Sequence, residues 1–414
     1  MTAPVPAPPP PCAALSARSA WGMLLALSCG FALSQAFRST TAIMATGLRA
    51  DFALSAQTLG VLAGAFAFAF GAMQLFIGIA IDLYGLRRTL LAVSPLTLAG
   101  ALLSALAPGY GVVLFGQVLI GVGCAPAFLV CTVFIARHFE PARFAAISGV
   151  VMGISGLGLL LTGTPLAWLV QQSSWRLGFG LLAALAALAW LLVWRQVHEA
   201  AQHELAAAAR APVRDAVRGL GALLLLPHTA GIMLLALTTY ASFLSLRALW
   251  LGPLLIERHG YSLLASGHVA LFASLISLFS PACFGRLDPG PATRRRWLVG
   301  CTLLLAALFA AIGLLQREWL DVGGPMAVAL LSGYMVLQYA DVRSAYPAAL
   351  TGRAMAAFTM ALFLGVALMQ WVTGIAASLA AARGIEPYAA VMLTIALMLV
   401  LGALAFKCLP APAH

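Results

Sequence analysis

Long apolar stretches separated by short polar segments form the dominant pattern of the chain. A helix needs about 20 apolar residues to cross the hydrocarbon core of a bilayer, and twelve stretches come close to or exceed this length. The predicted spans are residues 20–46, 57–81, 89–107, 111–136, 144–170, 176–194, 228–256, 264–284, 297–315, 325–340, 354–381 and 388–408. The pattern predicts an all-α membrane protein with twelve transmembrane helices and no separate soluble domain.

Polar segments divide this pattern into domains. Residues 1–19 are rich in proline and alanine and are predicted to be a disordered cytoplasmic tail. Residues 195–227 hold the one long polar stretch, whose alanines and charges fit a helix on the membrane surface. It separates two predicted six-helix bundles, 20–194 and 228–408, and residues 409–414 form a second cytoplasmic tail.

Composition narrows the class of protein. Residues are 63% hydrophobic and only 8% charged, whereas a soluble domain is about 25% charged, so a cytosolic enzyme and a disordered chain are both excluded. The net charge of +11 would suggest a nucleic-acid partner in a soluble protein. Here 16 basic residues fall on the side of the chain ends and 5 on the other, which indicates cytoplasmic termini in an inner or plasma membrane. The expected partner is lipid, with no nucleic acid.

The sequence shows no pattern for binding a metal or a cofactor. The seven cysteines are scattered, mostly inside apolar stretches, without ligand-like spacing. Nucleotide-binding glycine loops and zinc signatures are also missing from the sequence. We therefore expect no metal, no cofactor and no enzymatic activity.

The two halves of the chain resemble each other. The loop after span two carries Gly78, Asp82, Gly85, Arg87 and Arg88, and the loop after span eight carries Asp288. Asp82 and Asp288 are 206 residues apart, and Arg38 and Arg247 are 209 apart. Two features that repeat at nearly the same period indicate a duplicated six-helix unit.

Twelve spans in two related halves, with this loop, resemble the major facilitator superfamily. The loop is similar to that superfamily's signature G-x-x-x-D-x-x-G-x-[KR]-[KR], with Leu83 where a basic residue is usual. The resemblance implies a secondary active transporter whose halves rock around a central site. It also implies that the signature residues and Asp288 form a latch of charge-assisted hydrogen bonds between the halves in one state. The alternative is that the loop only anchors the topology.

Span five is rich in small residues, which allow close approach of transmembrane helices. The residues concerned are Gly149, Gly153, Gly156, Gly158, Gly163 and Pro165. They loosely resemble a glycine-rich motif of antiporters, and helix packing explains them equally well. In span four, Gln117 stands where many relatives carry an arginine.

Two arginines, Arg38 and Arg247, lie inside predicted spans. A charge in mid-membrane costs at least about 2.5–3.5 kcal/mol, so it is expected to face the protein interior and mark a site. Both lie roughly 15–17 Å from the same end of their helices, while all twelve acidic residues fall at segment ends or outside. We expect a positive cavity in which both arginines bind an anionic group bidentately. The alternative is that they bond helix carbonyls or extend to the interface.

This arrangement is similar to the organic-anion and organophosphate branches of the superfamily, which implies a carboxylate or phosphate-ester substrate. The further candidates for substrate binding are Gln35, Gln117, Tyr240, Trp250, His268, Tyr334, Gln338, Tyr339 and Gln370. His268 is also a candidate proton carrier, unless coupling is by anion exchange.

Two other functions remain open from the sequence. One is an exporter or importer of amphipathic compounds such as drugs or siderophores, favoured by the aromatic residues around Arg247. The other is a membrane receptor without transport, disfavoured by the lack of an output domain. We expect the protein to act as a monomer on a small-molecule substrate.

Overall fold

A computed structural model describes residues 17–140, 143–198, 226–346 and 348–410. Within these residues the chain is helical, with no β-strand, and twelve helices are long and apolar enough to cross a membrane. The predicted all-α fold with twelve spans is therefore confirmed. The predicted tails and the polar stretch of the central loop lie largely outside the described residues.

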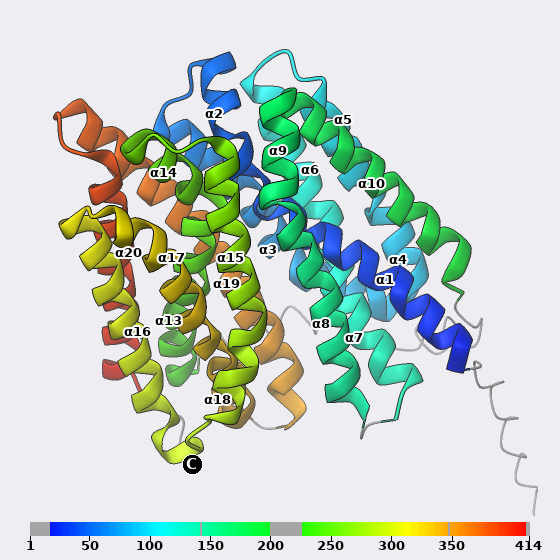
Figure 1. The fold of residues 1–414 in the computed structure, drawn as a ribbon. Helices are drawn as coiled ribbons and strands as arrows, with labels where there is room; N and C mark the ends of the chain where they lie inside the picture. The colour runs from blue at the N-terminus through cyan, green and yellow to red at the C-terminus, as the bar shows by residue number, and fades with distance from the viewer. Residues whose placement is uncertain (1–16, 141–142, 199–225, 347, 411–414) are drawn as a thin grey trace, which may run out of the picture.

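The first six spans pack together as one bundle (Figure 1). Their helices are α1 (Ala17–Phe37), α2 (Thr40–Phe52), α3 (Ala56–Tyr84), α4 (Leu86–Val93), α5 (Pro95–Ala105), α6 (Tyr110–Cys124), α7 (Pro126–His138), α8 (Phe144–Leu161), α9 (Thr164–Gln172) and α10 (Trp175–Gln196). Four of the six spans are thus interrupted. Prolines at the first turn of α5, α7 and α9 account for three interruptions, because proline starts a helix well but cannot continue one.

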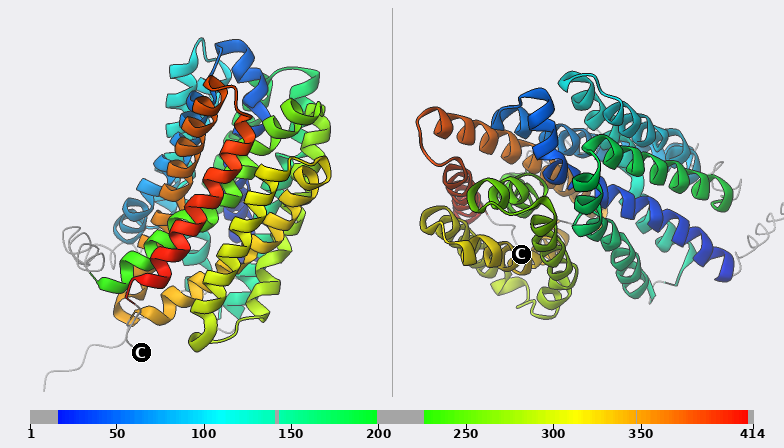
Figure 2. Two further views of the ribbon diagram at one scale, coloured as in Figure 1. Left: turned by 90° about the vertical axis from the view of Figure 1, so that its left-hand side faces the viewer. Right: turned by 45° about the horizontal axis from the view of Figure 1, so that its top comes forward.

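The last six spans form the second bundle, which Figure 2 shows beside the first. Its helices are α13 (Pro227–Ser245), the π-helix η2 (Leu246–Trp250), α14 (Leu251–His259), α15 (Leu263–Arg286), α16 (Pro291–Leu315), α17 (Glu318–Leu331), the 3₁₀-helix η3 (Ser332–Tyr334), α18 (Met335–Ala345), α19 (Ala348–Ala382) and α20 (Pro387–Cys408). Span ten is longer than predicted, covering 318–345.

The duplicated unit is visible in the backbone of two equivalent turns. Gly85, before α4, has φ 83° and ψ 167°, and Gly290, before α16, has φ 82° and ψ 167°. A positive φ is available to glycine without the steric penalty that a Cβ brings. The two halves therefore use the same turn after their second span.

The two bundles pack against each other along α3 and α19, where Gly60, Gly64 and Gly71 lie against α19. They are joined further at one end of the molecule, which we call the distal end. It lies opposite to the proximal end, where α1 begins and α20 ends (Figures 1 and 2). At the distal end Arg49 of α2 forms an ion pair with Glu257 of α14, and the backbone N–H of Leu264 donates to Gln171 Oε1 over 3.1 Å. These contacts join the halves there, while the ribbons of α7 and α8 diverge from α18 toward the proximal end (Figure 1).

The small residues of span five have different surroundings. A Cβ on Gly158 would overlap the carbonyl oxygen of Ala32 in α1, and one on Gly163 would crowd Leu271 of α15. Gly149 and Gly153 have open space instead. Close packing thus explains Gly158 and Gly163, and it does not explain Gly149 and Gly153.

We expect Gly158→Ala to destabilise the protein. The new methyl group would push α8 away from α1, and such overpacking costs about 1–3 kcal/mol. Gly153→Ala on the same helix meets nothing within 4 Å, so it should leave the melting temperature in detergent unchanged or slightly raised. Equal melting temperatures for the two variants would contradict this account of the helix crossing.

Candidate functional site

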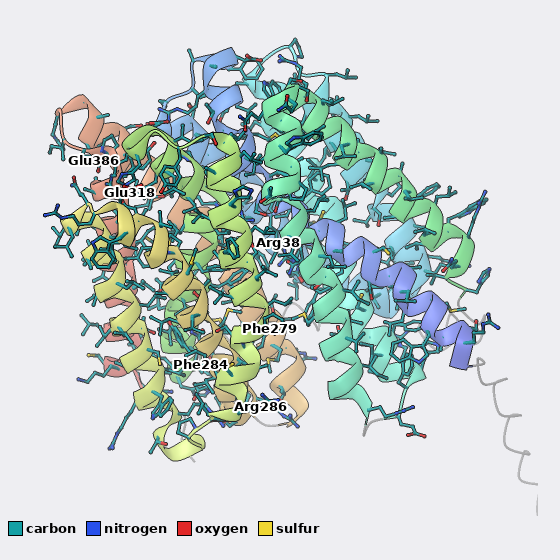
Figure 3. All side chains as sticks on the ribbon, viewed as in Figure 1. Arg38, Phe279, Phe284, Arg286, Glu318 and Glu386 are labelled. Carbon is teal, nitrogen blue, oxygen red and sulfur yellow. The ribbon has the colours of Figure 1, made fainter. Side chains whose placement is uncertain are left out.

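Arg38 lies where span one is interrupted, between α1 and α2 and between the two bundles (Figure 3). No proline causes this interruption. Hydroxyls bond to the carbonyls of the last turn of α1 instead: Ser39 Oγ donates to Ala36 O over 3.4 Å and Thr40 Oγ1 donates to Phe37 O over 2.9 Å. Side chains of this kind compete with the helical backbone pattern. The sequence Arg-Ser-Thr-Thr thus places a guanidinium at a non-helical position inside the membrane.

The guanidinium of Arg38 rests on aromatic groups from both bundles. Its Cζ lies 4.6 Å from the ring centre of Phe70 in α3 and 4.7 Å from that of Phe363 in α19. These two ring centres are only 4.3 Å apart, so the rings form one floor beneath the cation. Nη1 donates to the hydroxyl of Tyr240 over 3.5 Å, and Tyr339 lies within electrostatic range of both Arg38 and Tyr240.

No carboxylate among the described side chains neutralises the positive charge of Arg38. None of the ion pairs among the described residues involves Arg38. Its Nε is buried without a hydrogen-bond partner in the described part of the chain. A cation–π contact contributes about 0.5–2 kcal/mol, less than a charge inside a membrane costs. The side chain is therefore held in position but keeps a donor for a ligand.

Several predicted polar residues are buried and incompletely bonded. Gln35, Gln117 and Gln370 each have an Oε1 with no partner among the described residues, and Gln338 has such an Nε2. Gln338 Oε1 accepts from Thr239 Oγ1 over 3.2 Å. Gln35 lies one helical turn before Arg38 on α1, and Thr239 precedes Tyr240 on α13. These amides offer unused donors and acceptors in the interior.

The guanidinium of Arg247 is hydrogen-bonded to other groups of the protein, whereas we predicted that it faces a cavity beside Arg38. Arg247 is 1% exposed and extends from η2 to the first bundle, where Nη2 donates to the carbonyl oxygens of Leu159 (3.3 Å) and Thr162 (3.5 Å). Its Nε donates to Ser274 Oγ of α15 over 3.0 Å. The alternative of bonding to helix carbonyls thus describes Arg247 in this conformation, although its Nη1 is buried with no partner among the described residues. Its Nη2 also donates to Thr162 Oγ1 over 3.5 Å, and that hydroxyl bonds to Ser39, the residue after Arg38, over 2.7 Å.

Three further candidates make no contact with Arg38 in the described part of the chain. Trp250 donates through Nε1 to Thr373 Oγ1 over 2.9 Å and packs against Tyr388. Tyr334 forms a hydroxyl–hydroxyl bond of 2.8 Å with Thr302 inside the second bundle. His268 is exposed on α15. The structure gives the first two a packing role and does not bring His268 to the arginine.

The sequence did not single out Phe70 and Phe363. Each lies in an apolar helix with many aromatic or aliphatic neighbours, and no local pattern marks the one residue that meets a cation. Tyr339 was recognised only as one of several polar residues in span ten. The contacts become apparent when α3, α13, α18 and α19 are placed together.

The predicted latch is described only in part. The side chain of Asp82, the central residue of the predicted latch, lies outside the described residues, so the latch role of Gly78, Asp82, Gly85 and Arg88 stays a prediction. Arg87 Nε donates to Val197 O over 2.6 Å, at the end of α10 in its own bundle.

In the second half, Arg294 binds both oxygens of Asp288 over 3.0 and 2.7 Å. This hydrogen-bonded pair holds the pKa of Asp288 below its usual value. In this conformation Asp288 is thus bonded within its own bundle, and not to the other half as the predicted latch requires.

Comparison with known proteins places the chain in a family of transporters. The family model described as Major Facilitator Superfamily matches residues 27–369. The chain is 27% identical over 159 residues to a hexuronate transporter of Bacillus subtilis, which covers 38% of this chain and 37% of that protein. It is 24% identical over 157 residues to a probable sulfoacetate transporter of Cupriavidus necator, covering 38% and 36%. The matched part spans little more than a third of these curated relatives.

The fold has close counterparts among solved structures. A D-xylose–proton symporter superposes with a TM-score of 0.73 at 17% identity, covering 95% of this chain and 98% of that one. A nucleoside transporter gives 0.72 at 15% identity, covering 94% and 99%. Such low identity shows the fold alone. Together with the family match over most of the chain, these findings show that the protein is a membrane transporter and not an enzyme, and that it belongs to the major facilitator superfamily.

Proposed function

We propose that this transporter moves a small organic anion, a carboxylate or a phosphate ester, and that Arg38 binds the anionic group. The observation that carries the proposal is the guanidinium between the two bundles, which no described carboxylate neutralises. Its planar fork suits a carboxylate or a phosphate. An anion bound there would neutralise the charge and occupy the free Nε.

The surroundings of Arg38 suit an anion with a hydroxylated organic body. Tyr240 and Tyr339 bring phenol groups, Gln35 brings an amide, and the rings of Phe70 and Phe363 provide a flat apolar surface. Two relatives are named for hexuronate and sulfoacetate. Both compounds carry a carboxylate or sulfonate on a small polar body. A sugar acid is therefore the first substrate to test.

The proposal includes alternating access. We assign the distal end to the outside of the inner membrane, because the basic residues are concentrated at the chain ends. The contacts at the distal end then correspond to a state closed to the outside, in which Arg247 helps to close that end. The latch formed by Asp82 and Asp288 belongs to the opposite state, which is open to the outside. The transporting unit in this proposal is one chain.

The test is counterflow in proteoliposomes. We expect unlabelled glucuronate inside the vesicles to accelerate the entry of labelled glucuronate, and sulfoacetate or a sugar phosphate inside to compete. If none of these anions exchanges while a cationic amphipathic drug is transported, the proposal fails and transport of amphipathic compounds takes its place.

A further inference from the structure

A group of charged side chains lies at the distal end of the second bundle, away from Arg38. Figure 3 labels Glu318 and Glu386 there. The members come from the end of α14, the start of α17 and the turn before α20. They are Arg258, His259, Asp321 and Glu386, which we call the distal cluster.

Asp321 is the centre of the distal cluster. It lies near the end of its span, as the sequence indicated, but its side chain is fully buried. Its Oδ2 accepts from Arg258 Nη1 over 2.8 Å and is 2.7 Å from His259 Nε2. Its Oδ1 is buried with no partner among the described residues. A buried carboxylate oxygen without a donor is costly, which marks the position as one where a proton would be stabilised.

The net charge of the distal cluster is one unit negative, so one added proton would neutralise it. Arg258 binds Asp321 and also Glu386, whose two oxygens lie 3.2 and 2.7 Å from the guanidinium. With neutral His259 the cluster holds two negative charges and one positive charge, of which Asp321 and Arg258 are buried and Glu386 is 32% exposed. A net charge in such surroundings is unfavourable unless it is balanced. One added proton, on the imidazole of His259, makes the cluster neutral.

The distal cluster is joined to the contact between the bundles. Glu257, the residue before Arg258 on α14, forms the ion pair with Arg49 of the first bundle. Tyr388, two residues after Glu386, interacts with both members of that pair. The titratable and charged groups linked to His259 by described contacts are Arg49, Glu257, Arg258, Tyr261, Glu318, Asp321, Glu386 and Tyr388.

We propose that the distal cluster is a proton-binding site that controls closure of the distal end. With the proton bound, the last turn of α14 is held to α17 and α20, and Glu257 is positioned for Arg49. Without it, the uncompensated negative charge loosens the same turn and weakens the closed state. Proton binding and closure are therefore linked, with at most about a tenfold change in the closed-to-open ratio per pH unit for one proton. The inference does not depend on which substrate is carried.

The experiment measures closure directly, without substrate. Spin labels on Ser173→Cys of the first bundle and Ala382→Cys of the second, both at exposed distal positions, report the distance between the bundles. The exposed native cysteines Cys29, Cys283 and Cys408 are replaced by serine. We expect the closed fraction to fall as the pH is raised from 5.5 to 8.5.

Three variants separate a proton site from a merely structural ion-pair cluster. His259→Gln should give a smaller closed fraction that no longer changes with pH. Glu386→Gln removes one negative charge, so it should keep the distal end closed at every pH. His268→Gln, which changes the exposed histidine on α15, should retain the wild-type response. If Glu386→Gln opens the distal end as His259→Gln does, or if all variants keep the wild-type pH dependence, the proposal is overturned.

Discussion

Replacing Arg38 by alanine is expected to weaken binding of an anionic substrate roughly 10- to 150-fold. A hydrogen bond to a charged group contributes about 1.5–3 kcal/mol, and removing the guanidinium takes away the charge that the bound anion neutralises. The aromatic floor of Phe70 and Phe363 would remain. The affinity for glucuronate, measured by calorimetry on the purified protein, checks this expectation.

Two companion variants make the result specific to the guanidinium of Arg38. Arg38→Lys keeps the charge but loses the fork, so it should restore only part of the affinity. Arg286→Ala removes an exposed arginine at the proximal end and should leave the affinity unchanged. An Arg38→Ala protein that binds glucuronate as tightly as the wild type would show that the anion is held elsewhere.

Replacing Arg247 by alanine is expected to open the distal end, with the closed-to-open ratio falling about tenfold or more. Its guanidinium crosses from the second bundle to the carbonyls of Leu159 and Thr162 in the first. Each lost charge-assisted bond is worth about 1.5–3 kcal/mol, and the buried carbonyls lose a donor. Cross-linking of Gln57→Cys with Ser378→Cys reports closure, since these positions approach across the bundles, with 2.9 Å between Gln57 N and Ser378 Oγ.

Ser274→Ala is the matched control for Arg247. Ser274 accepts from Arg247 Nε within the second bundle, so this variant leaves the bonds between the bundles in place and should keep most of the cross-linking. If Arg247→Ala instead retains full cross-linking and loses glucuronate affinity, Arg247 is a substrate ligand, as the sequence alone suggested.

The spans and the duplicated halves were predictable because membrane thickness sets the length of an apolar helix. Both features follow from the order of residues along the chain and need no knowledge of which helices touch. The ends of spans were less predictable: Glu318 and Asp321 were excluded from span ten because they are charged, although they form the first turn of α17. Arg258 donates to Asp321 and Tyr261 donates to Glu318, and such partners cannot be deduced from hydropathy.

The sequence could indicate which residues of the candidate site are unusual, but not which partners their side chains contact. A charge within a span indicated that Arg38 and Arg247 are unusual. Their equal depth in the membrane did not show in which direction each side chain extends, because each guanidinium bonds to a partner on another helix. The interruption of span five after Leu161 places carbonyl acceptors within reach of Arg247, whereas Arg38 lies on two aromatic rings and bonds only to the hydroxyl of Tyr240 among the described residues.

The most direct test of the central claim compares glucuronate with glucuronamide, its neutral amide, for binding to the wild type and to Arg38→Ala. The account predicts that the wild type prefers the anion roughly 10- to 150-fold. The variant should bind both compounds with the affinity that the wild type has for the amide. An unchanged preference for the anion in Arg38→Ala, or no preference in the wild type, would contradict the assignment of Arg38 as the residue that binds the anionic group.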